Sequence, residues 1–203
     1  IALGRIKSWL KRKNLKVVDD LSTPRIDIPG QVDLIVVIGG DGTLLNIAKF
    51  AQGKGVPIIG INMGGLGFLT EVALKEAYNS LEGVLKGRCN ISERMMLTAE
   101  VLRGKEVTGS YEALNDVVIS KGALSRMMTL RLDINNEFVT SYFCDGLIIS
   151  TSTGSTAHAL SSGGPIVHPF LTVIIVVPIC PHTLSNRPLV IPGESVVDVR
   201  ILS

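Results

Sequence analysis

The chain has 203 residues, of which 20 are Lys or Arg and 18 are Asp or Glu, so its formal net charge is +2. Hydrophobic residues make up 46% and there are 21 glycines, which excludes intrinsic disorder. Because the positive charges are almost fully offset, we expect no nucleic-acid partner that binds a basic face. The longest apolar run, 171–177, is far shorter than the about 20 residues of a membrane-spanning helix. We therefore expect no membrane association.

The cysteines and the first residue indicate the cellular location of the protein and the extent of the chain. Cys89, Cys144 and Cys180 are odd in number and widely spaced, which fits neither a disulfide framework nor a zinc site. A reducing cytoplasmic location is the prediction. Since the chain begins at Ile1 rather than Met, we expect it to be part of a longer protein.

The first half alternates predicted strands and helices. Buried strands are predicted at 34–38 and 57–61, because both are continuous apolar runs. Helical spacing of apolar residues follows each strand: Leu44, Ile47, Ala48 and Ala51 after the first, and Leu74, Ala77, Tyr78, Leu81 and Leu85 after the second. This order predicts a parallel sheet in an α/β domain, which we place at residues 1–93.

After about residue 93 the apolar period changes from 3.6 to 2. Apolar and polar residues alternate over 128–134, and Asn135-Asn136 then predicts a hairpin turn. Further short strands are predicted at 117–120, 147–150, 171–177 and 196–202. The segment 151–164 is too rich in Ser, Thr and Gly for a central strand, and 178–182 is interpreted as a rigid turn with too few ligands for a metal. Residues 94–203 are therefore expected to form an all-β domain.

The strongest motif is Gly39-Gly40-Asp41-Gly42-Thr43, between a predicted strand and a predicted helix. Backbone N–H groups at such a turn, together with the helix dipole, form a site for a phosphate. Asp41 would repel that phosphate unless it has another task, such as removing a hydroxyl proton or holding a metal. The alternative is a helix N-cap. The three glycines that flank Asp41 favour a functional role over a helix cap.

Two weaker motifs lie in the second half. Residues 151–158 and 161–165, which follow Asp145-Gly146, offer hydroxyl and backbone groups without bulk, as a ribose and phosphates require. Asn115-Asp116 could accept hydrogen bonds from the vicinal hydroxyls of a ribose, although by itself this dipeptide is better explained as a turn before a strand.

Taken together, these segments resemble the NAD kinase family. The resemblance covers about 33–192 and rests on GGDGT at 39–43, GGLGFL at 64–69, LND at 114–116, DGLIIST at 145–151, TGSTA at 153–157 and GGPIVHP at 163–169. GGDGT also occurs in diacylglycerol and sphingosine kinases. TGSTA and GGPI in series are more specific to NAD kinases.

The resemblance implies an α/β domain and an all-β domain with the nucleotide site between them. It implies transfer of the γ-phosphoryl group of ATP, or of polyphosphate, to the 2′-hydroxyl of the adenosine ribose of NAD, with Mg²⁺ or another divalent cation. By position, Asp41 would activate that hydroxyl. The residues that would bind the nucleotides are Gly39, Gly40, Gly42, Thr43, Phe68, Asn115, Asp116, Arg126, Asp145, Thr156, Ala157, His158 and Ser161. The resemblance also implies a homodimer or homotetramer.

Three positions depart from the family pattern: His158 replaces a common Tyr, Ser152 a Pro, and Asp116 a Glu. Two other functions stay open. A lipid kinase of the GGDGT type predicts a membrane-binding face, against which the near-neutral charge counts. A non-catalytic dinucleotide-binding module predicts binding without turnover, and it leaves Asp41 unexplained.

Overall fold

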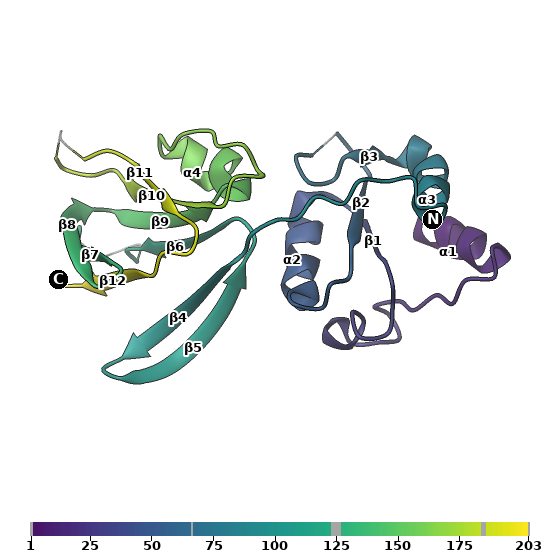
Figure 1. The fold of residues 1–203 in the computed structure, drawn as a ribbon, viewed down its shortest axis with the longest axis horizontal. Coiled ribbons are helices and arrows are strands. Elements are labelled where there is room, and N and C mark those ends of the chain that lie inside the picture. The colour runs from purple at the N-terminus through teal and green to yellow at the C-terminus, as the bar shows by residue number, and fades with distance from the viewer. Residues whose placement is uncertain (1, 66, 123–126, 184–185, 203) are drawn as a thin grey trace. The chain divides into compact units, whose positions relative to one another are not determined.

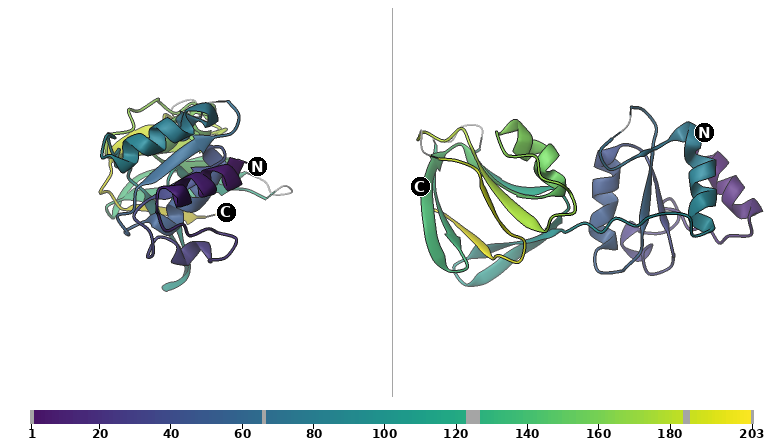
Figure 2. Two further views of the ribbon diagram at one scale, coloured as in Figure 1. Left: turned by 90° about the vertical axis from the view of Figure 1, so that its right-hand side faces the viewer. Right: turned by 45° about the horizontal axis from the view of Figure 1, so that its top comes forward.

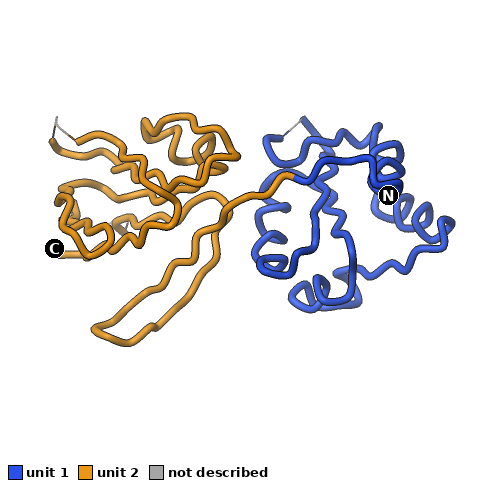
Figure 3. Tube along the Cα trace, viewed as in Figure 1, with its two compact units in different colours: residues 1–91 blue, residues 92–203 orange. Residues whose placement is uncertain are grey.

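The computed structural model describes residues 2–65, 67–122, 127–183 and 186–202. The chain divides into two compact units, residues 1–91 and 92–203 (Figure 3). Each unit has its own sheets and its own core, and each is described by itself.

The first unit is built on a parallel sheet. Strands β1 (Ile35–Ile38), β2 (Ile58–Asn62) and β3 (Val72–Ala73) lie in the order β1-β2-β3, and both pairings are parallel. Helix α2 (Asp41–Ala51) connects β1 to β2. The predicted strands at 34–38 and 57–61 and the parallel sheet are confirmed; the short β3 was not predicted.

Helices cover both faces of this sheet (Figures 1 and 2). On one face, α1 (Ala2–Arg12) and α3 (Ala77–Leu85), which follows a 3₁₀ turn at Leu74–Glu76, pack against the strands. Their core is formed by Ile6, Ile61, Ala77 and Leu81. On the other face α2 buries Leu44, Ala48 and Ala51. The helical spacing of these apolar residues therefore reflects burial against the sheet.

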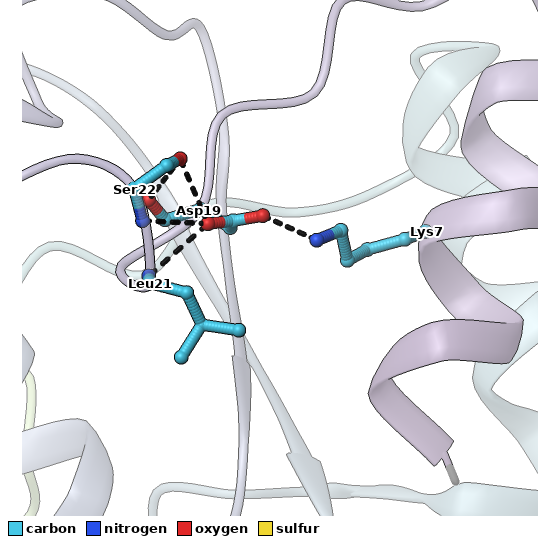
Figure 4. Close-up of polar contacts among 4 residues, drawn as sticks. All are labelled: Lys7, Asp19, Leu21 and Ser22. Carbon is cyan, nitrogen blue, oxygen red and sulfur yellow. Dashed lines mark hydrogen bonds and ion pairs between the residues drawn. The ribbon is translucent and has the colours of Figure 1, made fainter.

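A polar cluster ties α1 to the segment that follows it (Figure 4). Lys7 on α1 forms an ion pair with Asp19. The other Asp19 oxygen accepts hydrogen bonds from the backbone N–H groups of Leu21 (3.1 Å) and Ser22 (3.0 Å). The Lys7 ammonium, followed by the Ser22 hydroxyl and these backbone donors, lowers the pKa of Asp19 to about 2. The carboxylate is therefore ionised at neutral pH.

The second unit consists of antiparallel strands. The sheets have the orders β11-β10-β9-β6 and β12-β7-β8, and β4 and β5 form a separate two-stranded hairpin. Their bounds are β4 Leu97–Arg103, β5 Glu106–Ala113, β6 Asp116–Ser120, β7 Met128–Ile134, β8 Glu137–Cys144, β9 Gly146–Thr151, β10 Val173–Ile179, β11 Leu189–Pro192 and β12 Val197–Ile201. The predicted β-rich second half is confirmed, although the β4–β5 hairpin was not predicted.

The two larger sheets pack face to face and enclose the main core. Leu130 and Leu132 of β7 meet Leu147 and Ile149 of β9 there. The opposite face of β9 and β10 is covered by the short helix α4 (His158–Ser161), whose Ala159 packs against Ile148. Because β9 is buried on both faces, apolar residues occupy consecutive positions at 147–149 rather than alternating with polar ones.

Of the two predicted turns, the hairpin turn at 135–136 is confirmed and the rigid turn at 178–182 is displaced. Asn135 and Asn136 have φ angles of 51° and 67°, as expected of a tight hairpin turn. The rigid turn predicted at 178–182 begins later than expected, because β10 continues through Pro178 to Ile179 and only Cys180 has a positive φ of 46°. Pairing with β11 ends at Val176, so a missing N–H at Pro178 costs no bond on that side. Within the described residues, no helix is long and apolar enough to cross a membrane.

Candidate active site

The glycine turn after β1 leads directly into α2. Gly40 is the N-cap, without a side-chain cap, and Asp41 is the first residue of the helix. The alternative that Asp41 serves as N-cap is therefore wrong. The first N–H groups of a helix have no acceptor within the helix, and its dipole favours an anion there. This end of α2 has the features of a phosphate site.

The Asp41 carboxylate is bound instead by the segment that follows β2. Its Oδ1 accepts hydrogen bonds from the N–H groups of Leu69 (3.2 Å) and Thr70 (2.9 Å) and from the Thr70 hydroxyl (2.9 Å). Its Oδ2 accepts one hydrogen bond, from the Phe68 N–H at 2.9 Å. Residues 68–70 therefore hold the carboxylate next to the glycine turn at the start of α2.

These hydrogen bonds also set the charge of Asp41. Partial burial by itself raises the pKa of this carboxyl, but the hydrogen bonds from Thr70, Leu69 and Phe68 outweigh it and leave the pKa below its ordinary value. Asp41 is thus ionised at neutral pH and can accept a proton.

Gly67 lets the two segments approach each other. A β-carbon at this position would lie 2.2 Å from Asp41 Oδ1 and 2.6 Å from Thr70 Oγ1. Real β-carbon contacts are not that short, so a larger residue would push the carboxylate aside.

In the second unit, residues 114–115 hold the turn that follows β9. The Asn115 carbonyl accepts the Thr151 N–H at 2.8 Å, and the Thr151 hydroxyl donates to the Leu114 carbonyl at 2.6 Å. Gly154 packs so closely here that a β-carbon would lie 2.2 Å from the Asn115 oxygen. The 3₁₀ turn Thr153–Thr156 is thereby fixed beside Asn115 and Asp116.

Polar groups with unused hydrogen-bonding capacity lie at this turn. Among the described residues, Asn115 Oδ1 and Thr153 Oγ1 are buried without a hydrogen-bond partner. Burial raises the pKa of Asp116, while the nearby His158 lowers it. Buried polar atoms without partners are rare, so this place is suited to bind a polar ligand.

Asp145 lies at the other end of β9. Ser150, near the Asn115 end, pairs with Asp116, whereas Gly146 pairs with Ser120. Since Asn115 lies opposite Thr151, the length of β9 separates Asp145 from Asn115 by roughly 20 Å, at about 3.3 Å per residue. Asp145 forms an ion pair with Lys121 at 2.7 Å.

The remaining predicted residues have varied surroundings. Gly39, Gly40, Gly42 and Thr43 form the turn and the first turn of α2. Thr156 ends the 3₁₀ turn, Ala157 is the N-cap of α4, and His158 and Ser161 belong to α4. The Phe68 side chain is 74% exposed. Arg126 lies outside the described residues.

Sequence reasoning missed the contribution of Asn62, Gly67, Thr70 and Lys121. A signal existed for Asn62, because a polar residue at the carboxyl end of a buried parallel strand marks the edge where ligands bind. Thr70 and Lys121 had none, since their partners lie far away in sequence.

Comparison with known proteins agrees with these features. The N-terminal domain of ATP-NAD kinases matches residues 6–89, and their C-terminal domain matches residues 114–203. The NAD kinase of Geotalea daltonii is 50% identical over 88% of this chain, which spans 63% of that protein. The NAD kinase of Geobacter metallireducens is 51% identical over 98% of this chain, which spans 74% of it.

Solved structures give the same result. An NAD kinase from Archaeoglobus fulgidus in complex with ATP has a TM-score of 0.82 and 31% identity, covering 98% of this chain and 76% of its own. Yeast NADH kinase complexed with NADH also has a TM-score of 0.82, with 34% identity over 88% of this chain and 53% of its own. The resemblance found in the GGDGT and TGSTA segments is confirmed. The chain belongs to the NAD kinase family.

Proposed function

We propose that the protein transfers the γ-phosphoryl group of ATP to the 2′-hydroxyl of the adenosine ribose of NAD, which yields NADP and ADP. The observation that carries this proposal is the Asp41 carboxylate, ionised and held beside the glycine turn at the start of α2. Family membership supports the choice of substrates, since the Archaeoglobus relative was solved with ATP and the yeast relative with NADH.

In this proposal Asp41 receives the proton of the 2′-hydroxyl. The hydroxyl oxygen forms a bond to the γ-phosphorus, and the bond from that phosphorus to the bridging oxygen of ADP breaks. Because an ionised carboxylate of low pKa is a weak base, Asp41 takes the proton late, as negative charge leaves the hydroxyl oxygen. Positioning supplies most of the catalysis in phosphoryl transfer.

The nucleotide contacts belong to the same proposal. The N–H groups at Gly39, Gly40, Gly42 and Thr43 would bind phosphate oxygens. Asn115 and Asp116, with Thr156, Ala157, His158 and Ser161, would bind the adenosine part of NAD, while Phe68 and Asp145 would contact its nicotinamide part. An extended dinucleotide agrees with the separation of Asp145 from Asn115.

The divalent cation of this reaction is proposed to bind mainly through the phosphates of ATP. Among the described residues, no group of three or more His, Cys, Asp or Glu side chains could hold a metal ion. Mg²⁺ commonly binds substrate phosphates and keeps several waters. We therefore propose that it arrives on ATP, where it neutralises phosphate charge, and we assign it no protein ligand.

Two further features support the proposed self-association and cytoplasmic location. The β4–β5 hairpin exposes Leu102 and Tyr111, which are 51% and 61% accessible, and an isolated two-stranded hairpin is marginally stable. These features support a homodimer or homotetramer, measurable by light scattering. The three free cysteines support a cytoplasmic location.

A coupled assay tests the function. Full-length protein is incubated with NAD, ATP and Mg²⁺, and NADP is detected with an NADP-specific dehydrogenase. Asp41→Asn should lower kcat by about 10²- to 10⁴-fold, with NAD affinity retained in calorimetry. Asp33→Asn, at an exposed position of the same unit, is the matched control.

The outcomes separate the alternatives. NAD binding without NADP formation would favour the dinucleotide-binding module. Phosphorylation of diacylglycerol in vesicles, without NAD binding, would favour the lipid kinase. Near-normal turnover by Asp41→Asn would overturn the role of this carboxylate.

A further inference from the structure

A buried polar pair, Asn62 and Thr70, is hydrogen-bonded to Asp41 through the Thr70 hydroxyl. Their side chains come from the end of β2 and from the segment after it, and the residues are 6% and 0% exposed. We propose that Thr70, oriented by Asn62, is a positioning residue that holds Asp41 Oδ1 so that Oδ2 receives the substrate proton. This inference rests on the proposed function.

The orientation of Asn62 is determined by its neighbours. Asn62 Oδ1 accepts the Gly64 N–H at 2.8 Å, and only an oxygen can accept that bond. The amide nitrogen Nδ2 must therefore face Thr70, to whose hydroxyl it donates at 2.7 Å. A flipped amide would place two donors against each other at Gly64.

The orientation of the Thr70 hydroxyl then follows. A hydroxyl has a single proton, and Thr70 Oγ1 already accepts from Asn62, which can only donate at that atom. The proton is therefore directed to Asp41 Oδ1, 2.9 Å away. The chain Gly64, Asn62, Thr70 and Asp41 has one consistent direction of donation.

The two carboxylate oxygens of Asp41 consequently differ. Oδ1 accepts three hydrogen bonds, two of them from Thr70. Oδ2 accepts one, from Phe68. An oxygen with three donors has little capacity for a fourth, whereas Oδ2 retains capacity for an incoming hydroxyl. The rotation of the carboxylate is thereby restricted before substrate arrives.

The surroundings of this carboxylate supply hydrogen bonds rather than opposite charge. Among the described residues, every interaction that lowers the pKa of Asp41 comes from an uncharged group: the Thr70 hydroxyl and the N–H groups of Phe68, Leu69 and Thr70. Removal of the Thr70 hydroxyl should therefore change both the orientation and the titration of Asp41, with no ion pair to compensate.

The experiment compares Thr70→Val with Thr70→Ser in the full chain. Valine has nearly the same shape without the hydroxyl, and serine restores it. The Asp41 carboxyl is titrated by ¹³C NMR, and kcat and both KM values are measured at a pH where Asp41 is ionised. Thermal unfolding checks that each variant folds.

The expected result is selective for Thr70→Val. Its Asp41 pKa should rise by about one unit. Although the carboxylate then becomes a stronger base, kcat should fall about 10- to 100-fold, because Oδ2 is no longer oriented toward the substrate hydroxyl. Both KM values should stay within about threefold. Thr70→Ser should remain within about threefold of the parent in kcat, with its Asp41 pKa unchanged.

Other outcomes overturn the proposal. An unchanged Asp41 pKa and kcat in Thr70→Val would remove Thr70 from the mechanism, and a raised KM alone would assign it to binding. If Thr70→Val does not fold, Asn62→Ala must show a smaller change of the same sign, or the proposal fails. If the parent makes no NADP, the proposed function fails, and the NMR titration still decides whether Thr70 controls Asp41.

Discussion

Gly67 and Asp41 are in such close contact that no side chain fits between them, since a β-carbon on Gly67 would lie 2.2 Å from Asp41 Oδ1. Gly67 lies in the segment after β2, and Asp41 begins α2. The glycine therefore allows the backbone donors to reach the carboxylate.

Gly67→Ala should displace the Asp41 carboxylate. We expect kcat to fall about 10- to 100-fold, because misplacement of a reacting group is costly, and the free energy of unfolding to fall by about 1–3 kcal/mol through overpacking. Steady-state kinetics and urea unfolding measure the two effects. Gly65→Ala is the control, because a β-carbon there meets no atom within 4 Å. Equal activity of the two variants would contradict this account.

Asp116→Asn should increase stability while it weakens NAD binding. Burial raises the pKa of Asp116 in the folded protein. Because the folded protein holds the Asp116 proton more tightly than the unfolded chain, protonation favours the fold. This stabilisation is complete below the unfolded pKa of about 3.9 and is lost as the pH rises through the pKa of the folded protein. Asparagine does not ionise, so the variant should not lose stability over this pH range.

The Asp116→Asn variant should therefore have a higher Tm than the parent at pH 8 and an equal Tm near pH 3.5. Calorimetry should show weaker NAD binding at pH 8. Asp198→Asn on β12 is the charge-matched control. A lower Tm of Asp116→Asn at pH 8 would show that the charge is stabilised in the fold.

Lys7→Met should destabilise the first unit in a pH-dependent manner. The Lys7 ion pair lowers the pKa of Asp19 to about 2. The contribution of this ion pair to the free energy of unfolding is complete above the unfolded Asp19 pKa of about 3.9 and is lost as the pH falls through about 2. Thermal unfolding should show a lower Tm at pH 7 and a smaller difference at pH 2.5.

Lys11→Met is the control for this ion pair. Lys11 lies on the same helix and has no ion pair with any residue that the structure describes. A Tm difference for Lys7→Met that is independent of pH would point to lost packing of the lysine stem instead.

Ala159→Leu should displace α4 from the sheet. Ala159 is fully buried and packs against Ile148 of β9. A larger side chain there costs about 1–3 kcal/mol in the free energy of unfolding and moves His158 and Ser161. We expect NAD affinity to fall about tenfold or more, measured by calorimetry, as these residues would bind adenosine. Leu160→Ala, at a position 41% exposed, should bind NAD normally.

Much of the fold could be predicted from local patterns. The continuous apolar runs predict β1 and β2, because strands buried on both faces need apolar residues throughout. Asn135-Asn136 predicts its turn because Asn tolerates a positive φ. By contrast, the β4–β5 hairpin has few buried side chains, so it carries no comparable signal.

For the candidate site, the sequence by itself determined which turn could bind phosphate and which carboxylate lies beside it, because glycines, a buried strand and a helix start are adjacent in the chain. Only the tertiary structure decided that the donors to Asp41 come from residues 68–70, and that Asp145 lies the length of β9 away from Asn115. Strand pairing and side-chain hydrogen bonds between distant residues set these relationships, and they depend on how the sheet brings the chain back on itself rather than on any local pattern.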